Sequence, residues 1–194
     1  MSKTERHYKM LLVSTDEKFI KEVSSLLQDE RYEYDASRSA ADAREKLRRK
    51  SFDLVIVNSP LIDEPGEKLC LDAVRCNGTI SAVFAASDAF EDINAKVSVH
   101  GVFVLRKPSS KIMVLQAISM MICARERLRT LEEKVGKAES KLDEIRVVNK
   151  AKCMLIEHEG LTEADAHRHI EKTSMDAGIP KKLVAQIIIN NYLK

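Results

Sequence analysis

The 194-residue chain has no tryptophan, and its four cysteines form no Cys-x-x-Cys pair. Cys70, Cys76, Cys123 and Cys153 also have no histidine at the spacing of zinc ligands, so neither a metal site nor a disulfide framework is predicted. The N-terminus lacks the charged segment and apolar core of a signal peptide. These absences predict a reduced, cytoplasmic protein.

Long apolar runs are missing as well. The longest, such as Leu54 to Val57, fall far short of the roughly 20 residues that cross a bilayer. There is no Gly-rich phosphate loop, nucleophile elbow or paired acid–base constellation, so we expect neither an enzyme nor a cofactor. The net charge of +2 neither requires nor excludes nucleic acid, and any basic surface must come from local clustering.

The first half of the chain alternates β-branched runs with helical patterns. We expect strands at 8–13, 33–36, 54–57, 82–86 and 102–105, and helices at 17–28, 40–50 and 66–76. Such alternation predicts an α/β domain with a doubly wound, five-stranded parallel sheet that helices cover on both faces. A core of about 120 residues leaves room for an appendage, so two units are expected.

From Ser110 the pattern is helical, with no proline before Pro180. One heptad core position holds Val114, Met121, Leu128, Val135 and Leu142, and the other holds Ala117, Ala124, Leu131, Ala138 and Ile145. This pattern predicts a coiled coil in which dimerisation rests on Leu128, Leu131, Val135, Ala138, Leu142 and Ile145. The alternative, mainly for the part before Arg125, is a helix packed on its own α/β domain.

Charges beside this apolar stripe indicate how two copies would be oriented. In a parallel pair Arg127 faces Glu132, and Lys134 faces Glu139. One repulsive pair, Lys141 with Arg146, opposes these two attractive pairs. The balance favours a parallel homodimer.

Two further helices are expected after a break at Gly160. Thr162 and Asp165 have the spacing of a capping box, so one helix runs from there to about residue 177, and a third begins near Pro180. Asp176 is interpreted as capping or bracing the turn between them. The expected core of this three-helix module is Ala151, Leu155, Ile156, Ala166 and Ile170, and the expected domains are 1–125, 126–145 and 146–194.

Three landmarks in the first domain match a known family in their spacing. They are Leu12-Val13-Ser14-Thr15-Asp16-Glu17, Asp53-Leu54-Val55-Ile56-Val57-Asn58 and Arg106-Lys107-Pro108. Residues 8 to 125 thereby resemble the receiver domain of two-component response regulators. The resemblance places a phosphoacceptor site at Thr15, Asp16, Asn58, Ser87 and Lys107.

That site is degenerate. Asn58 stands at the position of the nucleophile, and the acidic pair that would hold magnesium is reduced to Thr15 and Asp16. Ser87, or the adjacent Ala86, takes the place of the switch hydroxyl, and Val104 that of a switching aromatic. An amide is not a competent nucleophile, so we expect a pseudo-receiver without aspartyl phosphate, in which Lys107 pairs with Asp16 or with the Asn58 carbonyl.

Two alternatives concern the loop Ser59-Pro60-Leu61-Ile62-Asp63-Glu64-Pro65-Gly66. If the site is still phosphorylated, Asp63 in this loop is the alternative carboxylate that would accept the phosphoryl group. The loop also exposes apolar groups beside the site, where a regulatory protein partner would bind, unless it is an ordinary βα loop.

The last part of the chain also resembles a known family. The resemblance is carried by Asn149-Lys150-Ala151-Lys152-Cys153-Met154-Leu155-Ile156-Glu157-His158-Glu159-Gly160-Leu161-Thr162-Glu163-Ala164-Asp165-Ala166, Ser174-Met175-Asp176 and Val184-Ala185. Residues from about 131 to 193 thereby resemble the ANTAR domain, an RNA-binding module of transcription antitermination regulators. The sequence departs from the family at Cys153, where glycine is usual. It also departs at Lys181 and Lys182, in a stretch where the family normally has a leucine.

Charges in this module segregate along the sequence. Acids crowd the turn near Gly160, whereas cations lie on the helices, and Arg168 and Lys172 are one turn apart on one face. Such a face suits the phosphates of an RNA hairpin, although it also occurs as an ordinary solvated helix surface. The predicted RNA-binding residues are Lys150, Lys152, His167, Arg168, Lys172, Lys181 and Lys182.

The resemblance implies a dimer that holds two stem-loops of a leader transcript and prevents a terminator hairpin from forming. Two other functions stay open. A DNA-binding response regulator would need base-reading residues where Glu163-Ala164-Asp165 begins the second helix, and a protein-binding scaffold would have no RNA affinity.

Overall fold

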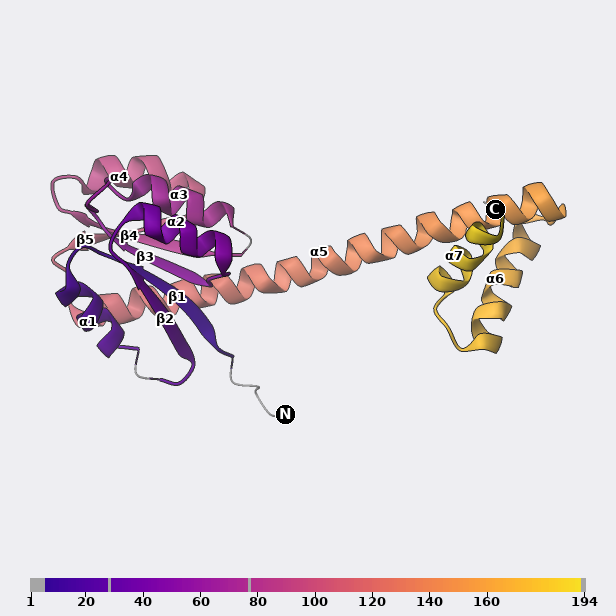
Figure 1. The fold of residues 1–194 in the computed structure, drawn as a ribbon, viewed down its shortest axis with the longest axis horizontal. Helices are drawn as coiled ribbons and strands as arrows, with labels where there is room; N and C mark the ends of the chain where they lie inside the picture. Colours follow the sequence, from indigo (N-terminus) through magenta and orange to yellow (C-terminus); the bar gives the residue numbers. More distant parts are fainter. Residues whose placement is uncertain (1–5, 28, 77, 193–194) are drawn as a thin grey trace. The chain divides into compact units, whose positions relative to one another are not determined.

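A computed structural model describes residues 6–27, 29–76 and 78–192. The chain divides into two compact units, Met1–Thr130 and Leu131–Lys194. The long helix α5, Lys111–Glu159, contributes residues to both units (Figure 1). Among the described residues, no helix combines the length and apolarity needed to cross a membrane.

The first unit contains a parallel five-stranded sheet in the order β2-β1-β3-β4-β5. Its strands are β1 Tyr8–Val13, β2 Tyr32–Ser37, β3 Leu54–Asn58, β4 Ile80–Ala86 and β5 Phe103–Lys107. The predicted fold class is confirmed. The strand order reverses between β1 and β3, so the loops after these strands diverge at the carboxyl edge of the sheet.

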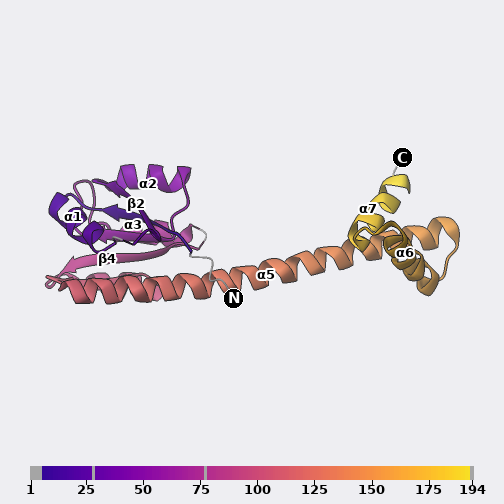
Figure 2. The same cartoon turned by 90° about the horizontal axis from the view of Figure 1, so that it is seen from below.

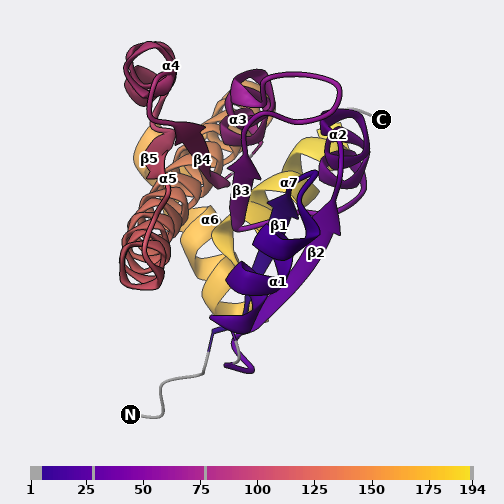
Figure 3. The ribbon, with the colours of Figure 1, turned by 90° about the vertical axis from the view of Figure 1, so that its left-hand side faces the viewer.

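Four helices and part of α5 cover the two faces of this sheet (Figure 3). They are α1 Glu17–Ser25, α2 Ala40–Arg49, α3 Glu67–Arg75 and α4 Phe90–Val97. The sequence-based prediction omitted α4, whose N-cap residue, Ala89, makes no side-chain cap. Its buried residues Ile93 and Val97 nevertheless have helical spacing.

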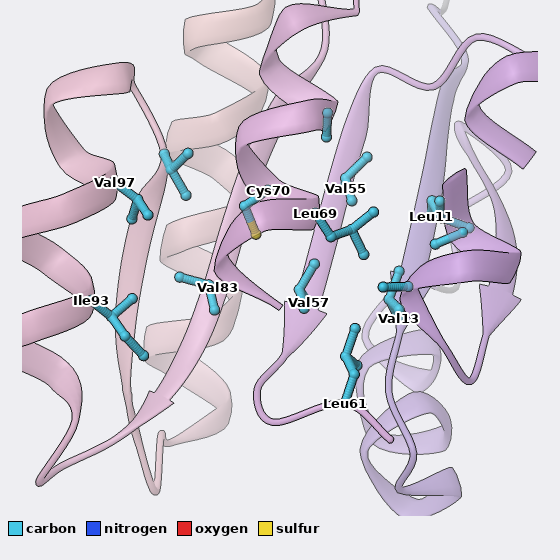
Figure 4. Packing of buried hydrophobic residues seen from close by; sticks show 14 of the residues in the cluster. Leu11, Val13, Val55, Val57, Leu61, Leu69, Cys70, Val83, Ile93 and Val97 are labelled. Carbon is cyan, nitrogen blue, oxygen red and sulfur yellow. The ribbon is translucent and has the colours of Figure 1, made fainter. Parts of the chain in front are cut away.

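Helices α2, α3 and α4 pack on one face of the sheet. Figure 4 shows the strand residues of this face directed toward α3 and α4. The fully buried side chains there include Leu11, Val13, Val55, Val57, Leu69, Cys70 and Val97. Cys70 is fully buried in this core, and its burial raises the pKa of the thiol to about 12.

Helices α1 and α5 pack on the opposite face. Val114, Ile118 and Met121 of α5 are buried there against the strands. The early heptad positions therefore face the chain's own sheet, as the alternative interpretation expected. Phe19 of α1 meets Phe84 of β4 edge to face, with ring centroids 5.2 Å apart.

In the second unit, the end of α5 packs with α6, Glu163–Ala177, and α7, Lys181–Tyr192 (Figure 2). Thr162 caps α6, because its Oγ1 accepts a hydrogen bond from the Asp165 N–H at 3.2 Å and donates to an Asp165 carboxylate oxygen at 2.7 Å. The core contains Ala151, Leu155, Ala166, Ile170, Val184, Ala185, Ile188 and Ile189. The prediction for Ile156 was wrong, since it is 37% exposed whereas Leu155 is 2% exposed.

Polar contacts fix the two ends of α7. Lys182 Nζ lies 2.5 Å from an Asp143 carboxylate oxygen of α5. At the other end, the Tyr192 ring stacks on His158 with centroids 4.7 Å apart, and its hydroxyl donates to Glu159. In the turn before α7, the Ser174 hydroxyl donates to the Ile179 carbonyl at 2.6 Å, so Ser174 braces this turn in place of Asp176.

Candidate functional site

Asn58, at the end of β3, is hydrogen-bonded on both sides of its amide. Its Nδ2 donates to Ser14 Oγ at 2.9 Å, and its Oδ1 accepts from Lys107 Nζ at 2.9 Å. Lys107 also donates to the carbonyl oxygen of Ser59. Of the two predicted partners for Lys107, the structure therefore has the Asn58 carbonyl.

Asp16, in the loop after β1, caps α1. Its Oδ1 accepts from the N–H of Lys18 at 2.8 Å, and its own N–H donates to Ser14 Oγ at 3.0 Å. Partial burial lowers the pKa of Lys107, and the negative charge of Asp16 opposes that shift. Within 6–27, 29–76 and 78–192, no three His, Cys, Asp or Glu side chains are grouped to hold a metal.

Four of the five predicted residues of the degenerate site lie around one cavity, and the fifth does not. Asp16, Asn58, Ser87 and Lys107 line one cavity, whereas Thr15 is exposed outside its lining. Ser87 Oγ donates to the backbone carbonyl of Lys107 at 2.9 Å, which joins β4 and β5 at this edge. Lys107 is thus held by Asn58, Ser59 and Ser87, and no carboxylate in the described part of the chain is hydrogen-bonded to it.

Asp63 is occupied elsewhere. Its two carboxylate oxygens accept hydrogen bonds from the N–H groups of Ala40 and Ala41, both at 2.9 Å, at the start of α2. These hydrogen bonds lower the pKa of Asp63, and the bond from Ala40 contributes most, with the bond from Ala41 next. This geometry makes Asp63 a capping residue and gives no support to its role as a substitute nucleophile.

The loop after β3 differs from the sequence-based expectation. Leu61 is 7% exposed and belongs to the hydrophobic core, so its predicted exposure was wrong. Ile62 is 80% exposed. The exposed apolar surface of this loop is therefore formed by Ile62 with Pro60 and Pro65.

Sequence reasoning missed an ion-pair cluster at the start of β3. Asp53 Oδ1 accepts from Arg125 Nε at 3.0 Å and from an Arg129 guanidinium nitrogen at 2.8 Å, while Oδ2 accepts from the Lys9 N–H at 3.0 Å. Arg129 also pairs with Glu126 at 2.7 Å. The one sequence signal was the helical spacing of the two arginines.

In the second unit, several predicted RNA-binding cations are engaged with acids. Lys152 Nζ donates to Glu163 at 3.1 Å, and Lys181 donates to Glu171. The Lys181 contact is the main cause of the lowered pKa of Glu171, and His167 lies 3.4 Å from the same carboxylate. The predicted segregation of charges was therefore wrong for Lys152, which pairs with an acid of the turn near Gly160, whereas Lys181 and Lys182 pair with acids on the helices.

The remaining predicted cations are open to solvent. The Arg168 side chain is 78% exposed, with one guanidinium nitrogen 3.7 Å from Asp165. Lys150 and Lys172 are exposed, and neither forms an ion pair with any residue in the described part of the chain. Arg168 and Lys172 lie one turn apart on α6, as predicted.

The apolar stripe on α5 changes character along the helix. Leu128 is half-buried in the first unit, whereas every residue from 131 to 146 is exposed. The large side chains of the stripe in this segment are between 47% and 57% exposed, and they are Leu131, Val135, Leu142 and Ile145. Ala138 lies between them and is exposed as well.

Comparison with known proteins assigns the second unit. Residues 136–189 match the ANTAR domain. The chain is also similar to the transcriptional regulatory protein PdtaR of Mycobacterium tuberculosis, with 24% identity over 183 residues that cover 92% of this chain and 88% of the relative.

Solved structures resemble the first unit. One is the signal receiver domain of an HD domain-containing protein from Pseudomonas fluorescens Pf-5, with a TM-score of 0.58, 24% identity, and coverage of 69% of this chain and 97% of that one. Another is the signal receiver domain of a putative LuxO repressor from Vibrio parahaemolyticus, with a TM-score of 0.55, 22% identity, and coverage of 66% and 97%. These likenesses show a receiver-like fold before the ANTAR domain.

Proposed function

We propose that this chain, in which an ANTAR domain follows a receiver-like fold, is an RNA-binding transcriptional antiterminator and not an enzyme. The observation that carries the proposal is the match of residues 136–189 to the ANTAR domain, which includes most of the three-helix core. The similarity to PdtaR, named as a transcriptional regulatory protein, extends over both units and agrees with a regulatory role.

The exposed cations on the helices provide a surface for RNA. Arg168 and Lys172 present two positive charges on one face of α6, and Lys150 adds an exposed charge on α5. Cations of this kind bind phosphate oxygens and displace counterions, whereas unpaired loop bases supply sequence recognition. Lys152, Lys181 and Lys182 stabilise the helices by pairing with acids, so their contribution to RNA binding is smaller.

The proposed protein is a parallel homodimer. Leu131, Val135, Ala138, Leu142 and Ile145 form an exposed heptad stripe, and a second copy of the helix would bury it. Two ANTAR domains in one dimer match two stem-loops on one transcript. Binding of the first stem-loop raises the effective concentration of the second stem-loop at the other ANTAR domain.

Regulation in this proposal does not use phosphorylation. Asn58 replaces the carboxylate nucleophile, Asp16 caps α1, and Asp63 caps α2. The input is therefore a bound molecule or a protein partner. The dimer prevents a terminator hairpin by holding the upstream stem-loops.

Binding to RNA and to DNA separates the functional alternatives. The full-length protein is titrated with a two-stem-loop leader RNA and with duplex DNA of the same sequence at several salt concentrations. We expect RNA-selective binding that weakens with salt, and a salt slope reduced by about 1.5 to 2 in the double variant Arg168→Ala/Lys172→Ala. The matched control is Lys21→Ala/Lys68→Ala, which removes two exposed lysines from the receiver-like unit.

The other outcomes identify a different function. Equal or tighter binding to duplex DNA would indicate a DNA-binding regulator. Absence of binding to either nucleic acid would indicate a scaffold for proteins. RNA binding that falls equally in both double variants would contradict the assignment of the α6 face.

A further inference from the structure

A cavity lies at the carboxyl edge of the sheet in the first unit. Its volume is about 690 Å³, within the range of roughly 300–1,000 Å³ that small-molecule sites occupy. It is lined by Asp16, after β1, and by Asn58, at the end of β3, between which the strand order reverses. Ligands of open α/β sheets bind at this reversal point.

The polar end of the cavity contains Lys107, and within the described residues no carboxylate is hydrogen-bonded to it. Lys107 Nζ is hydrogen-bonded to two neutral oxygens, those of Asn58 and Ser59. The Asp16 carboxylate accepts from the backbone of α1 instead. A partly buried ammonium group without a paired carboxylate favours an anion beside it, and its lowered pKa reflects the cost of that burial.

Part of the remaining wall is apolar, and Lys18, Glu22, Asp88 and Lys111 add charged groups to the lining. Phe19 and Val23 of α1, Phe84 of β4 and Val114 of α5 line the cavity, and Leu26 extends this wall beyond the end of α1. Phe19 and Phe84 contact each other edge to face. An apolar wall joined to a few convergent polar groups is the usual construction of a small-molecule site.

We propose that this cavity binds a small organic anion with an apolar body, its charged group beside Lys107 and its body against Phe19, Phe84 and Val114. Asn58 replaces the phosphoacceptor carboxylate and thereby removes one source of repulsion for such an anion, and the carboxylates that remain in the lining are accompanied by three lysines. In the receiver-like domain, the bound anion takes the place of the phosphoryl group. It does not depend on RNA binding, so the failure of one proposal is distinguishable from the failure of the other.

The first test separates the charged group from the apolar body. The full-length protein is titrated with 8-anilinonaphthalene-1-sulfonate and with its uncharged analogue N-phenyl-1-naphthylamine, and fluorescence is measured. We expect saturable binding of the sulfonate at one site per chain, weakened about tenfold or more by Lys107→Met, with little change for the uncharged probe. The matched control is Lys68→Met, which removes an exposed lysine from α3 on the opposite face of the sheet.

A second variant tests the cavity without altering Lys107. Ala86 lines the cavity and is exposed at the end of β4, so Ala86→Phe fills space without replacing a buried side chain. This variant should lose saturable binding of both probes while its circular dichroism spectrum stays unchanged. Octanoate should displace the sulfonate probe in the wild type, whereas acetate, which lacks the body, and 1-octanol, which lacks the charge, should be at least about tenfold weaker.

Three results would overturn the proposal. One is the absence of saturable sulfonate binding in the wild type. Another is binding that is unchanged in Ala86→Phe, which would place the probe on another surface. The third is equal weakening by Lys107→Met and Lys68→Met, which would indicate a nonspecific effect of charge.

Discussion

Asp53 Oδ1 accepts a hydrogen bond of 3.0 Å from Nε of Arg125, and this contact joins the start of β3 to α5. The side chains of Asp53 and Arg125 are only 14% and 11% exposed. Arg129 shares the same oxygen, so two cations on successive turns of α5 depend on one carboxylate. The helix is thereby attached to the sheet just before its exposed segment begins.

Replacing Asp53 should weaken the receiver-like unit. Asp53→Ala leaves two arginine side chains and the Lys9 N–H without this acceptor, and we expect the free energy of unfolding to fall by about 2–3 kcal/mol. Chemical denaturation followed by circular dichroism measures this change. Asp35→Ala is the control, because Asp35 pairs with Lys50 at the surface, and its effect should be much smaller. Equal losses in both variants would contradict the importance of the buried cluster.

The receiver-like unit should not form an aspartyl phosphate. Incubation of the wild type with ³²P-labelled acetyl phosphate and magnesium should leave the protein unlabelled, because Asn58 has no nucleophilic carboxylate. Label that disappears in Asn58→Ala would disprove this prediction. Label that disappears in Asp63→Ala would instead show that the capping carboxylate of α2 is the acceptor.

Dimerisation should depend on the exposed stripe of α5. Leu142→Glu places a carboxylate at a core position of each helix, and the dimer dissociation constant should rise about a hundredfold or more because these charges would be desolvated. Sedimentation equilibrium measures this change. Ser140→Glu is the matched control, since residue 140 lies outside the stripe on the same helix. A wild type that stays monomeric at high concentration would rule out the proposed dimer.

The contribution of Asp63 to stability should depend on pH. Its pKa is lowered in the folded chain by the Ala40 and Ala41 N–H groups, so its stabilising effect is complete above the ordinary pKa of 3.8 and is lost as pH falls through the lowered value. Asp63→Ala should therefore have a lower melting temperature than the wild type at neutral pH, with a difference that shrinks below about pH 4. The control Asp176→Ala alters an exposed acid and should show no such difference. A melting-temperature difference that stays constant down to pH 2 would contradict the capping role.

Much of the fold could be predicted from local patterns. The central strands are continuously apolar, which is typical of strands that helices cover on both faces. The spacing of Thr162 and Asp165 predicted the start of α6 to within a residue. Helix α4 was missed because it is short and begins without a capping side chain. The prediction for Ile156 in α5 was wrong because Leu155 and Ile156 are adjacent and similarly hydrophobic, so the sequence does not distinguish them. Only Leu155 faces α6 and α7.

The polar contacts were less accessible to sequence reasoning. Lys107 and Asn58 are 49 positions apart, and only the family resemblance placed them together. Arg125 and Asp53, 72 positions apart, had no such guide. Likewise, the pairing of Lys182 with Asp143 depends on how α7 packs on α5, and the spacing of these residues in the sequence does not determine that packing.

The stacking of Tyr192 on His158 provides an intrinsic optical reporter. The chain has no tryptophan, and its other three tyrosines, Tyr8, Tyr32 and Tyr34, all lie in the receiver-like unit. In a variant with phenylalanine at those three positions, emission from the chain would come from Tyr192 alone. Contact with an imidazole and a carboxylate quenches a phenol, so detachment of α7 from the end of α5 would appear as a rise in fluorescence without any added label.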